Sequence, residues 1–260
     1  DMEWLPVLVA LAAVGIAALL SRTARLIGSK NSSLSCKEPP TPMLPNASAT
    51  LGLIKYRRSI FPKDFAPASE QCMPREVLER ALEAANWAPT HGKTEPWRFV
   101  VFSGCEAFSK LESVRRKATE RLFAAEPEKL EAALTKMARK SKELSNVQHI
   151  VAICCKRVAN RRGALMPMWE EHAAVACAVQ NLHLQLTAEG YVGYWSSGGT
   201  GADGWANSSE CRLLLGMDGE YQGERDETLG FFYIGATKTS KYRQYKASRG
   251  PIAEKVQWIL

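Results

Sequence analysis

Two segments in the first hundred residues carry side chains suited to ligand binding. Arg57-Arg58-Ser59 places two guanidinium groups beside a hydroxyl, a combination that can hold a phosphate through several charge-assisted hydrogen bonds. About thirty residues later, Pro89, Thr90 and His91 open a loop that leads into the apolar run 97–103. His91 therefore stands in a loop and not on an apolar face, which favours a role at a site over a place in the core.

A third segment, Trp195-Ser196-Ser197-Gly198, follows an apolar run that predicts a strand. Backbone amides and hydroxyls there could donate to a ring that takes up negative charge, and the alternative is an ordinary Gly/Ser turn. Residues 199–204 also match the G-x-G-x-x-G spacing of dinucleotide-binding loops. However, residues 234–238, around the end of the next predicted strand, include no acidic residue such as these folds place there. This match therefore does not indicate a dinucleotide-binding fold.

In this order and spacing, the segments resemble the nitroreductase-like FMN flavoproteins, above all the small bacterial nitroreductases, from about residue 50 to the C-terminus. The resemblance implies that Arg57 and Ser59 hold the FMN phosphate and that Arg58 contacts the adjacent ribityl chain and ring edge. It also implies that Arg249, in Arg249-Gly250-Pro251, closes on the phosphate. A solvated arginine in the C-terminal tail is the alternative for Arg249.

The resemblance further implies contacts with the flavin ring. Pro89 and Thr90 would lie near the ring, and His91 would reach the flavin bound mainly by the other subunit. The segment 195–198 would donate to the ring near its N5 atom. No residue is identified as catalytic, because no side chain is an obvious obligatory acid.

Two departures from the small bacterial enzymes stand in the loop around His91. Trp87 occupies a position where those enzymes commonly carry Arg, and Thr94-Glu95-Pro96-Trp97 replaces their Gln-Pro-Trp. The second form occurs in iodotyrosine deiodinases, which belong to the same superfamily and also carry an N-terminal membrane anchor. Deiodinases close a lid of Glu, Tyr and Lys over their substrate, but the equivalent region here, 106–147, contains no Tyr.

The expected function is that of an FMN-dependent oxidoreductase that uses NAD(P)H to reduce nitroaromatic, quinone or similar electron-poor acceptors by a ping-pong hydride mechanism. The expected assembly is a homodimer with FMN at the subunit interface. One alternative is a reductive dehalogenase similar to iodotyrosine deiodinase. The other is a non-catalytic, membrane-tethered protein that binds flavin.

The N-terminal part of the chain differs from the rest in composition. Residues 5–20 form an uninterrupted apolar run with acidic residues before it and basic residues after it. This pattern predicts a membrane anchor or targeting helix over 1–28, with the catalytic domain on the cytoplasmic side. An organelle presequence that is later removed is the alternative. A Pro/Ser-rich linker over 29–48 then leads to the FMN-binding domain, 49–260.

Composition excludes several other classes of protein. The net charge is +7, but no basic stretch is interleaved with aromatic residues, so no nucleic-acid partner is expected. The seven cysteines include no C-x-x-C pair, and no histidine has partners at metal-ligand spacing. This pattern favours reduced core thiols and predicts no metal site.

The elements that must position these residues follow from the hydrophobic pattern. Short apolar runs predict strands at 97–103, 149–155, 191–195 and 228–236, with helices between them. Strands that alternate with helices predict an α/β (α+β) domain in which helices flank a mixed central sheet. The segment 169–189 is apolar almost all round and should be buried on every side, in the domain centre or against another subunit.

Overall fold

The computed structural model describes residues 47–201 and 204–259. Residues 47–260 form one compact unit by their contacts. The predicted anchor, 1–28, and most of the predicted linker, 29–48, lie outside the described residues. No helix among the residues that the structure describes is long and apolar enough to cross a membrane.

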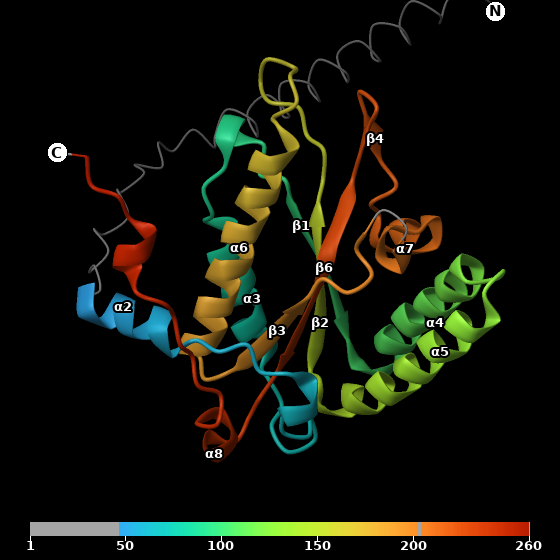
Figure 1. Cartoon of the computed structure of the whole chain (residues 1–260), viewed down its shortest axis with the longest axis horizontal. Coiled ribbons are helices and arrows are strands. Elements are labelled where there is room, and N and C mark those ends of the chain that lie inside the picture. Colours follow the sequence, from blue (N-terminus) through green and yellow to red (C-terminus); the bar gives the residue numbers. More distant parts are fainter. Residues whose placement is uncertain (1–46, 202–203, 260) are drawn as a thin grey trace, which may run out of the picture. The chain divides into compact units, whose positions relative to one another are not determined.

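A four-stranded sheet forms the centre of the domain (Figure 1). Its order is β1 (Trp97–Ser103), β2 (His149–Cys155), β6 (Glu227–Gly235) and β3 (Val192–Ser196). The first two strands have the bounds that the apolar runs predict, and the other two differ from prediction by one residue at each end. All neighbouring strands of this sheet are antiparallel, and among the described residues the only parallel pairing is an isolated bridge between Ser59 and Gly193.

One face of the sheet is covered by α3 (Arg75–Asn86) and α6 (Met168–Ala188), which pack against each other (Figure 1). Their inward residues are small or branched apolar side chains at helical spacing, so they form a close-packed layer over the strands. The core of this layer includes Val77, Ala81, Ala85, Val175, Val179, Leu182 and Phe232.

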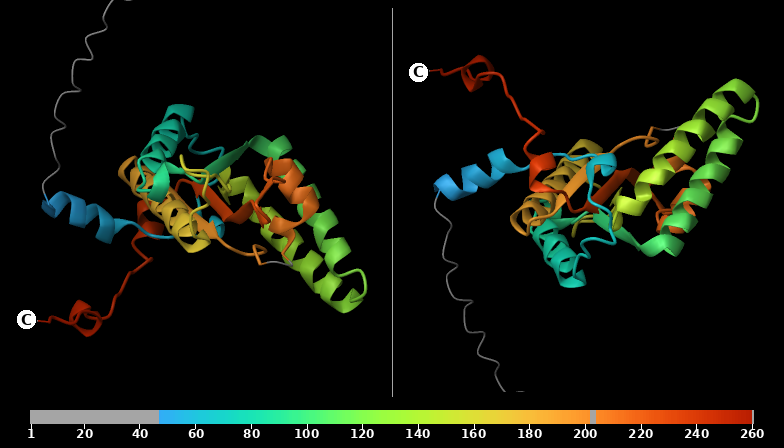
Figure 2. Two further views of the ribbon diagram at one scale, coloured as in Figure 1. Left: turned by 90° about the horizontal axis from the view of Figure 1, so that it is seen from above. Right: turned by 90° about the horizontal axis from the view of Figure 1, so that it is seen from below.

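The opposite face is covered by α4 (Gly104–Leu122) and α7 (Ser209–Leu215), around a second core that includes Phe102, Leu111, Ile150 and Phe231. Helix α5 (Pro127–Ser141) packs on α4 as a hairpin, and Figure 2 shows this hairpin projecting away from the sheet. Pro127 separates the two helices: α4 ends at Leu122, and Pro127 begins α5, since proline suits the first turn of a helix and not its interior.

Helix α7 has the ends that its sequence predicts. The Ser208 hydroxyl accepts a hydrogen bond from the Cys211 amide at 3.2 Å, and Gly216 ends the helix in the left-handed region with φ 63°. A small hairpin follows, with β4 (Glu220–Tyr221) and β5 (Glu224–Arg225), which the sequence did not indicate. This hairpin places Glu224 beside the loop that follows β2.

The segment 169–189 was predicted to be buried either in the domain centre or against another subunit, and the first alternative is wrong because one chain does not bury it on every side. The face of α6 toward the sheet is buried, but the opposite face is exposed at Ala173, Ala176 and Cys177. Trp169, at the start of the helix, is 70% exposed. Because this apolar face is open in one chain, we still expect another subunit to bury it.

The two ends of the described domain lie beside each other. Helix α2 (Ala47–Tyr56) contacts α8 (Thr239–Tyr242) in the C-terminal segment. The rings of Tyr56 and Tyr242, the last residues of these helices, stack at 4.8 Å. The chain then runs through a short 3₁₀ turn, Ile252–Lys255, to an exposed apolar end. There Trp258 is 81% exposed and Ile259 is 91% exposed.

Candidate active site

A cluster of positive charge follows α2, where the chain meets the edge strand β3. Arg57 Nη1 lies 3.4 Å from Ser59 Oγ, and Ser59 is held by its bridge to Gly193. Burial lowers the pKa of Arg57, and the nearby charges of Arg249 and Arg58 lower it further. The structure thus brings Arg57, Arg58, Ser59 and Arg249 to one place, which we call the arginine corner.

His183 on α6 supports the arginine corner from below, a role that sequence reasoning missed. Its side chain is buried, with Nε2 3.1 Å from the Arg58 carbonyl and Nδ1 3.4 Å from Arg57 Nη1. These partners fit a neutral ring that donates from Nε2 and accepts at Nδ1. Burial and the Arg57 charge lower the pKa of His183 to about 4, which keeps the ring neutral at physiological pH.

Arg58 is engaged with the backbone of its own chain. Its Nε donates to the Tyr245 carbonyl at 2.7 Å, and its Nη1 donates to the carbonyls of Lys55, Tyr56 and Arg57. These bonds fasten the end of α2 to the C-terminal segment that carries Arg249. Arg58 therefore shapes the arginine corner, and its expected contact with a ribityl chain and ring edge stays a prediction.

The loop around His91 is held at the other end of α6. His91 Nδ1 lies 2.5 Å from Glu170 Oε2, and the Thr90 hydroxyl lies 3.1 Å from that of Thr94. Lys93 and Glu95 have φ values of 55° and 46°, which are unusual for residues other than glycine. Surrounding contacts must hold this strained backbone, which is a common feature of functional loops.

Buried polar groups below this loop supply those contacts. The Thr94 hydroxyl donates to Glu171 Oε1 at 2.8 Å, and Glu171 Oε2 lies 3.8 Å from Arg157 Nη1. Arg157 Nη2 also pairs with Glu224 at 2.8 Å, and burial raises the pKa of Glu171. The sequence signal for this network was Glu171, an acidic residue on a helix position that faces the core.

The arginine corner and the His91 loop do not meet within one chain. Arg57 contacts His183, whereas His91 contacts Glu170, thirteen residues earlier on the same helix. At 1.5 Å per residue, these two points on α6 lie about 20 Å apart along its axis. One chain therefore presents two separate halves of the predicted flavin site.

The predicted ring-binding segment lies at the end of β3. Trp195 turns its indole toward the core and donates to the Leu229 carbonyl at 3.1 Å. Ser196 Oγ accepts from the Gly198 amide at 3.4 Å, and Gly199 has φ 88°. Because the sheet is antiparallel around this loop, residues 199–204 are not part of a dinucleotide-binding unit.

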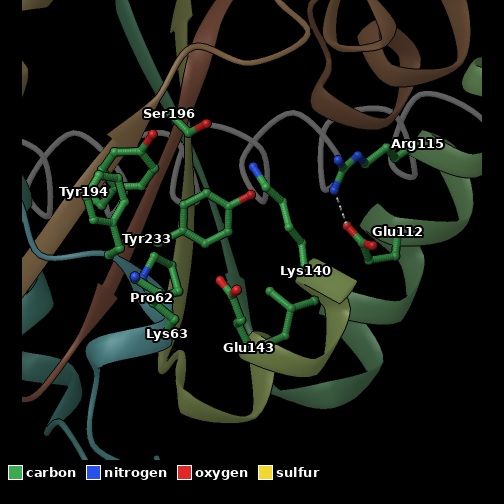
Figure 3. Close-up of a pocket in the computed structure, with 11 residues that line it drawn as sticks. Pro62, Lys63, Glu112, Arg115, Lys140, Glu143, Tyr194, Ser196 and Tyr233 are labelled. Carbon is green, nitrogen blue, oxygen red and sulfur yellow. Dashed lines mark hydrogen bonds and ion pairs between the residues drawn. The ribbon is translucent and has the colours of Figure 1, made fainter. Parts of the chain in front are cut away.

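Two neighbouring cavities, of about 350 and 320 Å³, lie between this segment and the α4–α5 hairpin. Figure 3 shows the first, with Tyr194 and Tyr233 on the sheet side and Lys140 and Glu143 on the α5 side. The cavities share four lining residues: Arg115, Lys140, Ser196 and Tyr233. The sequence analysis considered this hairpin only as the region equivalent to the deiodinase lid and assigned it no binding residue.

The domain is an antiparallel sheet between two helical layers, with a cationic corner at its edge strand. Comparison with known protein families identifies the class of proteins to which this arrangement belongs. The Nitroreductase family matches this chain over residues 54–236, and the chain belongs to that family.

Individual relatives agree with this assignment. The chain is 31% identical over 162 residues to a Haemophilus influenzae protein provisionally named an NAD(P)H nitroreductase. The alignment covers 62% of this chain and 76% of that protein. It is 26% identical over 170 residues to YdjA of Escherichia coli K12, which is also provisionally named an NAD(P)H nitroreductase. That alignment covers 65% of this chain and 78% of YdjA.

Solved structures confirm the fold. A nitroreductase-like family protein from Bacillus cereus matches with a TM-score of 0.59 and 22% identity, covering 83% of this chain and 98% of that one. The FMN-dependent nitroreductase NfnB from Mycobacterium smegmatis, in complex with NADPH, matches with a TM-score of 0.56 and 20% identity, covering 82% and 99%. The expected family resemblance and the helix–sheet fold class are therefore confirmed.

Proposed function

We propose that this protein is an FMN-dependent oxidoreductase that takes electrons from NAD(P)H. The observation that carries the proposal is the arginine corner. Arg57 and Arg249 are close enough to repel each other, yet within the described residues neither guanidinium forms an ion pair with a carboxylate. A phosphate that binds there would relieve this repulsion, and the Ser59 hydroxyl stands ready as a further donor.

In this proposal, each part of the site has a separate task. Bound FMN would supply the ring atom that accepts hydride from the nicotinamide and passes it on. Arg57, Ser59 and Arg249 would hold the phosphate. Amides and hydroxyls of 196–198 would donate toward the ring edge, and protons would come from solvent, because no side chain is assigned as a general acid.

We further propose that two chains share each flavin. The arginine corner and the His91 loop lie about 20 Å apart along α6 in one chain, so a single flavin could meet both only if the loop came from a partner. The open apolar face of α6 and the exposed end 256–259 offer surfaces that a homodimer would bury.

We propose that NAD(P)H and acceptor react in turn at the same ring, in ping-pong order, with nitroaromatics, quinones or similar electron-poor compounds as acceptors. The test is the absorption spectrum of the purified full chain. Oxidised flavin bands that bleach on anaerobic addition of NADPH or NADH, and return with nitrobenzene or a quinone, are the expected result. A colourless protein would contradict the proposal.

The same experiment separates the two alternatives. A membrane-tethered flavin carrier would show the flavin bands without bleaching by either nicotinamide. A dehalogenase related to the iodotyrosine deiodinases would release iodide from iodotyrosine after reduction, while nitrobenzene would leave the bleached spectrum unchanged.

The tether itself is a separate proposal, because residues 1–46 lie outside the described structure. We propose that 1–28 anchors the protein with its catalytic domain toward the cytoplasm, and an organelle presequence is the alternative. Retention in membranes through a carbonate wash would support the anchor. A mature protein that has lost its first thirty residues would support the presequence.

A further inference from the structure

The two cavities between the α4–α5 hairpin and the sheet have apolar walls on one side. The second cavity is lined by Leu122, Phe123, Met137, Trp205 and Phe231, and the rings of Trp205 and Phe231 stack at 4.9 Å. Aromatic and aliphatic walls of this kind bind flat apolar groups. The combined site therefore has a place for an aromatic ring.

The second cavity carries positive charge, whereas Glu112 and Glu143 also line the first. Arg115, Lys136 and Lys140 line the second cavity, and none of its lining residues that the structure describes is acidic. Arg115 is already paired with Glu112 at 3.2 Å and lies over the Trp205 ring at 5.3 Å. Among the described residues, no carboxylate pairs with Lys136 or Lys140.

Most of the charges that act on Lys140 are positive. Burial lowers the pKa of the Lys140 ammonium, and the charges of Arg115 and Lys136 lower it further. Glu143 is the acidic residue that opposes this effect, and it lies on the wall of the first cavity (Figure 3). A bound anion near Lys140 would be favoured, because it would offset the mutual repulsion of these cations.

The position of the site links it to the predicted flavin segment. Ser196, which belongs to that segment, lines both cavities together with Tyr233. A compound held here would lie beside the end of β3, where we propose that the flavin ring binds.

We propose that these two cavities form a binding site for a small aromatic carboxylate, with its ring against the apolar lining of the second cavity and its carboxylate at Lys140. The further statement that such a compound is a hydride acceptor rests on the proposed function, because it requires a flavin next to the site. Hydride acceptors with an acidic group would thus be preferred over neutral compounds of the same shape.

The test compares 4-nitrobenzoate with 4-nitrobenzamide, which share the ring and the nitro group and differ in charge. Binding is measured by calorimetric titration into the full oxidised holoprotein, without NAD(P)H. We expect the acid to bind the wild type at least tenfold more tightly than the amide, as a charge-assisted contact would provide.

Two substitutions and one control make the test specific. Lys140→Met should weaken binding of the acid about tenfold and leave the amide unchanged, while Glu143→Gln should strengthen binding of the acid by a few-fold. Lys117→Met removes an exposed cation of α4 that lines neither cavity, so it should change nothing. Circular dichroism checks that each variant is folded.

Equal affinity of the wild type for acid and amide would overturn the inference, and so would unchanged acid binding in Lys140→Met. Loss of bound FMN in Lys140→Met would also overturn it, because the cavities would then belong to the flavin. If the protein bound no FMN but kept a Lys140-dependent preference for the acid, the proposed function would fail and the anion site would stand. If NAD(P)H bleached the flavin bands but the protein showed no preference for the acid, the proposed function would stand and the anion site would fail.

Discussion

Acidification should destabilise this protein through His183, and the size of the effect follows from its surroundings. The side chain is 5% exposed, it donates to the Arg58 carbonyl, and it faces the Arg57 guanidinium. Burial and Arg57 lower its pKa from 6.5 to about 4. The folded state thus favours the neutral ring, so this contribution to stability is present above pH 6.5 and is lost as the pH falls toward 4.

At 1.36 kcal/mol per pH unit, the loss should reach about 2 kcal/mol at pH 5 and about 3 kcal/mol at pH 4. The assay is urea unfolding without added FMN at pH 7 and pH 5, for the wild type and for His183→Gln. Glutamine can still donate to the Arg58 carbonyl but does not titrate, so the difference between the two proteins isolates this ring from other groups, including His149. His183→Asn is a second variant in case the first does not fold.

The reasoning would be refuted if the wild type lost no more stability than His183→Gln between pH 7 and pH 5. A larger loss in the variant would refute it as well. Either result would mean that the ring is not held neutral between Arg57 and the Arg58 carbonyl.

Two further predictions concern the ends of the proposed flavin site. Arg57→Ala should weaken FMN binding about ten- to a hundredfold, since a charge-assisted contact is worth about 1.5–3 kcal/mol. The control Arg75→Ala, which removes an exposed ion pair on α3, should leave FMN binding unchanged. Fluorescence titration with FMN measures the affinity of both variants. Gly199→Ala should lower the free energy of unfolding by about 2–3 kcal/mol in urea, because φ is 88° and an added Cβ would lie 2.1 Å from Trp205 Nε1. Unchanged stability in that variant would show that the turn can rearrange.

The sequence predicted the main elements of the fold because each carries a strong local signal. The strands 97–103 and 149–155 are short apolar runs, and the break at Pro127 and the ends of α7 follow from the chemistry of Pro, Ser and Gly. The β4–β5 hairpin was missed because its two-residue strands are exposed and have no hydrophobic period.

The contacts that shape the site could not be predicted in the same way, because they join distant parts of the chain. The sequence analysis found no partner for His183 at metal-ligand spacing, and its contact with Arg57 spans 126 residues. The sequence also predicted a helix at 169–189 that is buried all round, but composition cannot say which molecule covers each face. In the single chain the sheet covers only one of them.

Complementation between two impaired variants, one defective in the arginine corner and one in the His91 loop, tests most directly whether two chains share each flavin. Chains with Arg57→Ala are mixed with chains that carry His91→Ala, and NAD(P)H-dependent reduction of a nitroaromatic compound is measured. Sharing across the dimer places both defects in one site and leaves the other intact, so each mixed dimer should regain about half of the wild-type activity. No gain on mixing, together with a wild type that sediments as a monomer with FMN bound, would contradict the account.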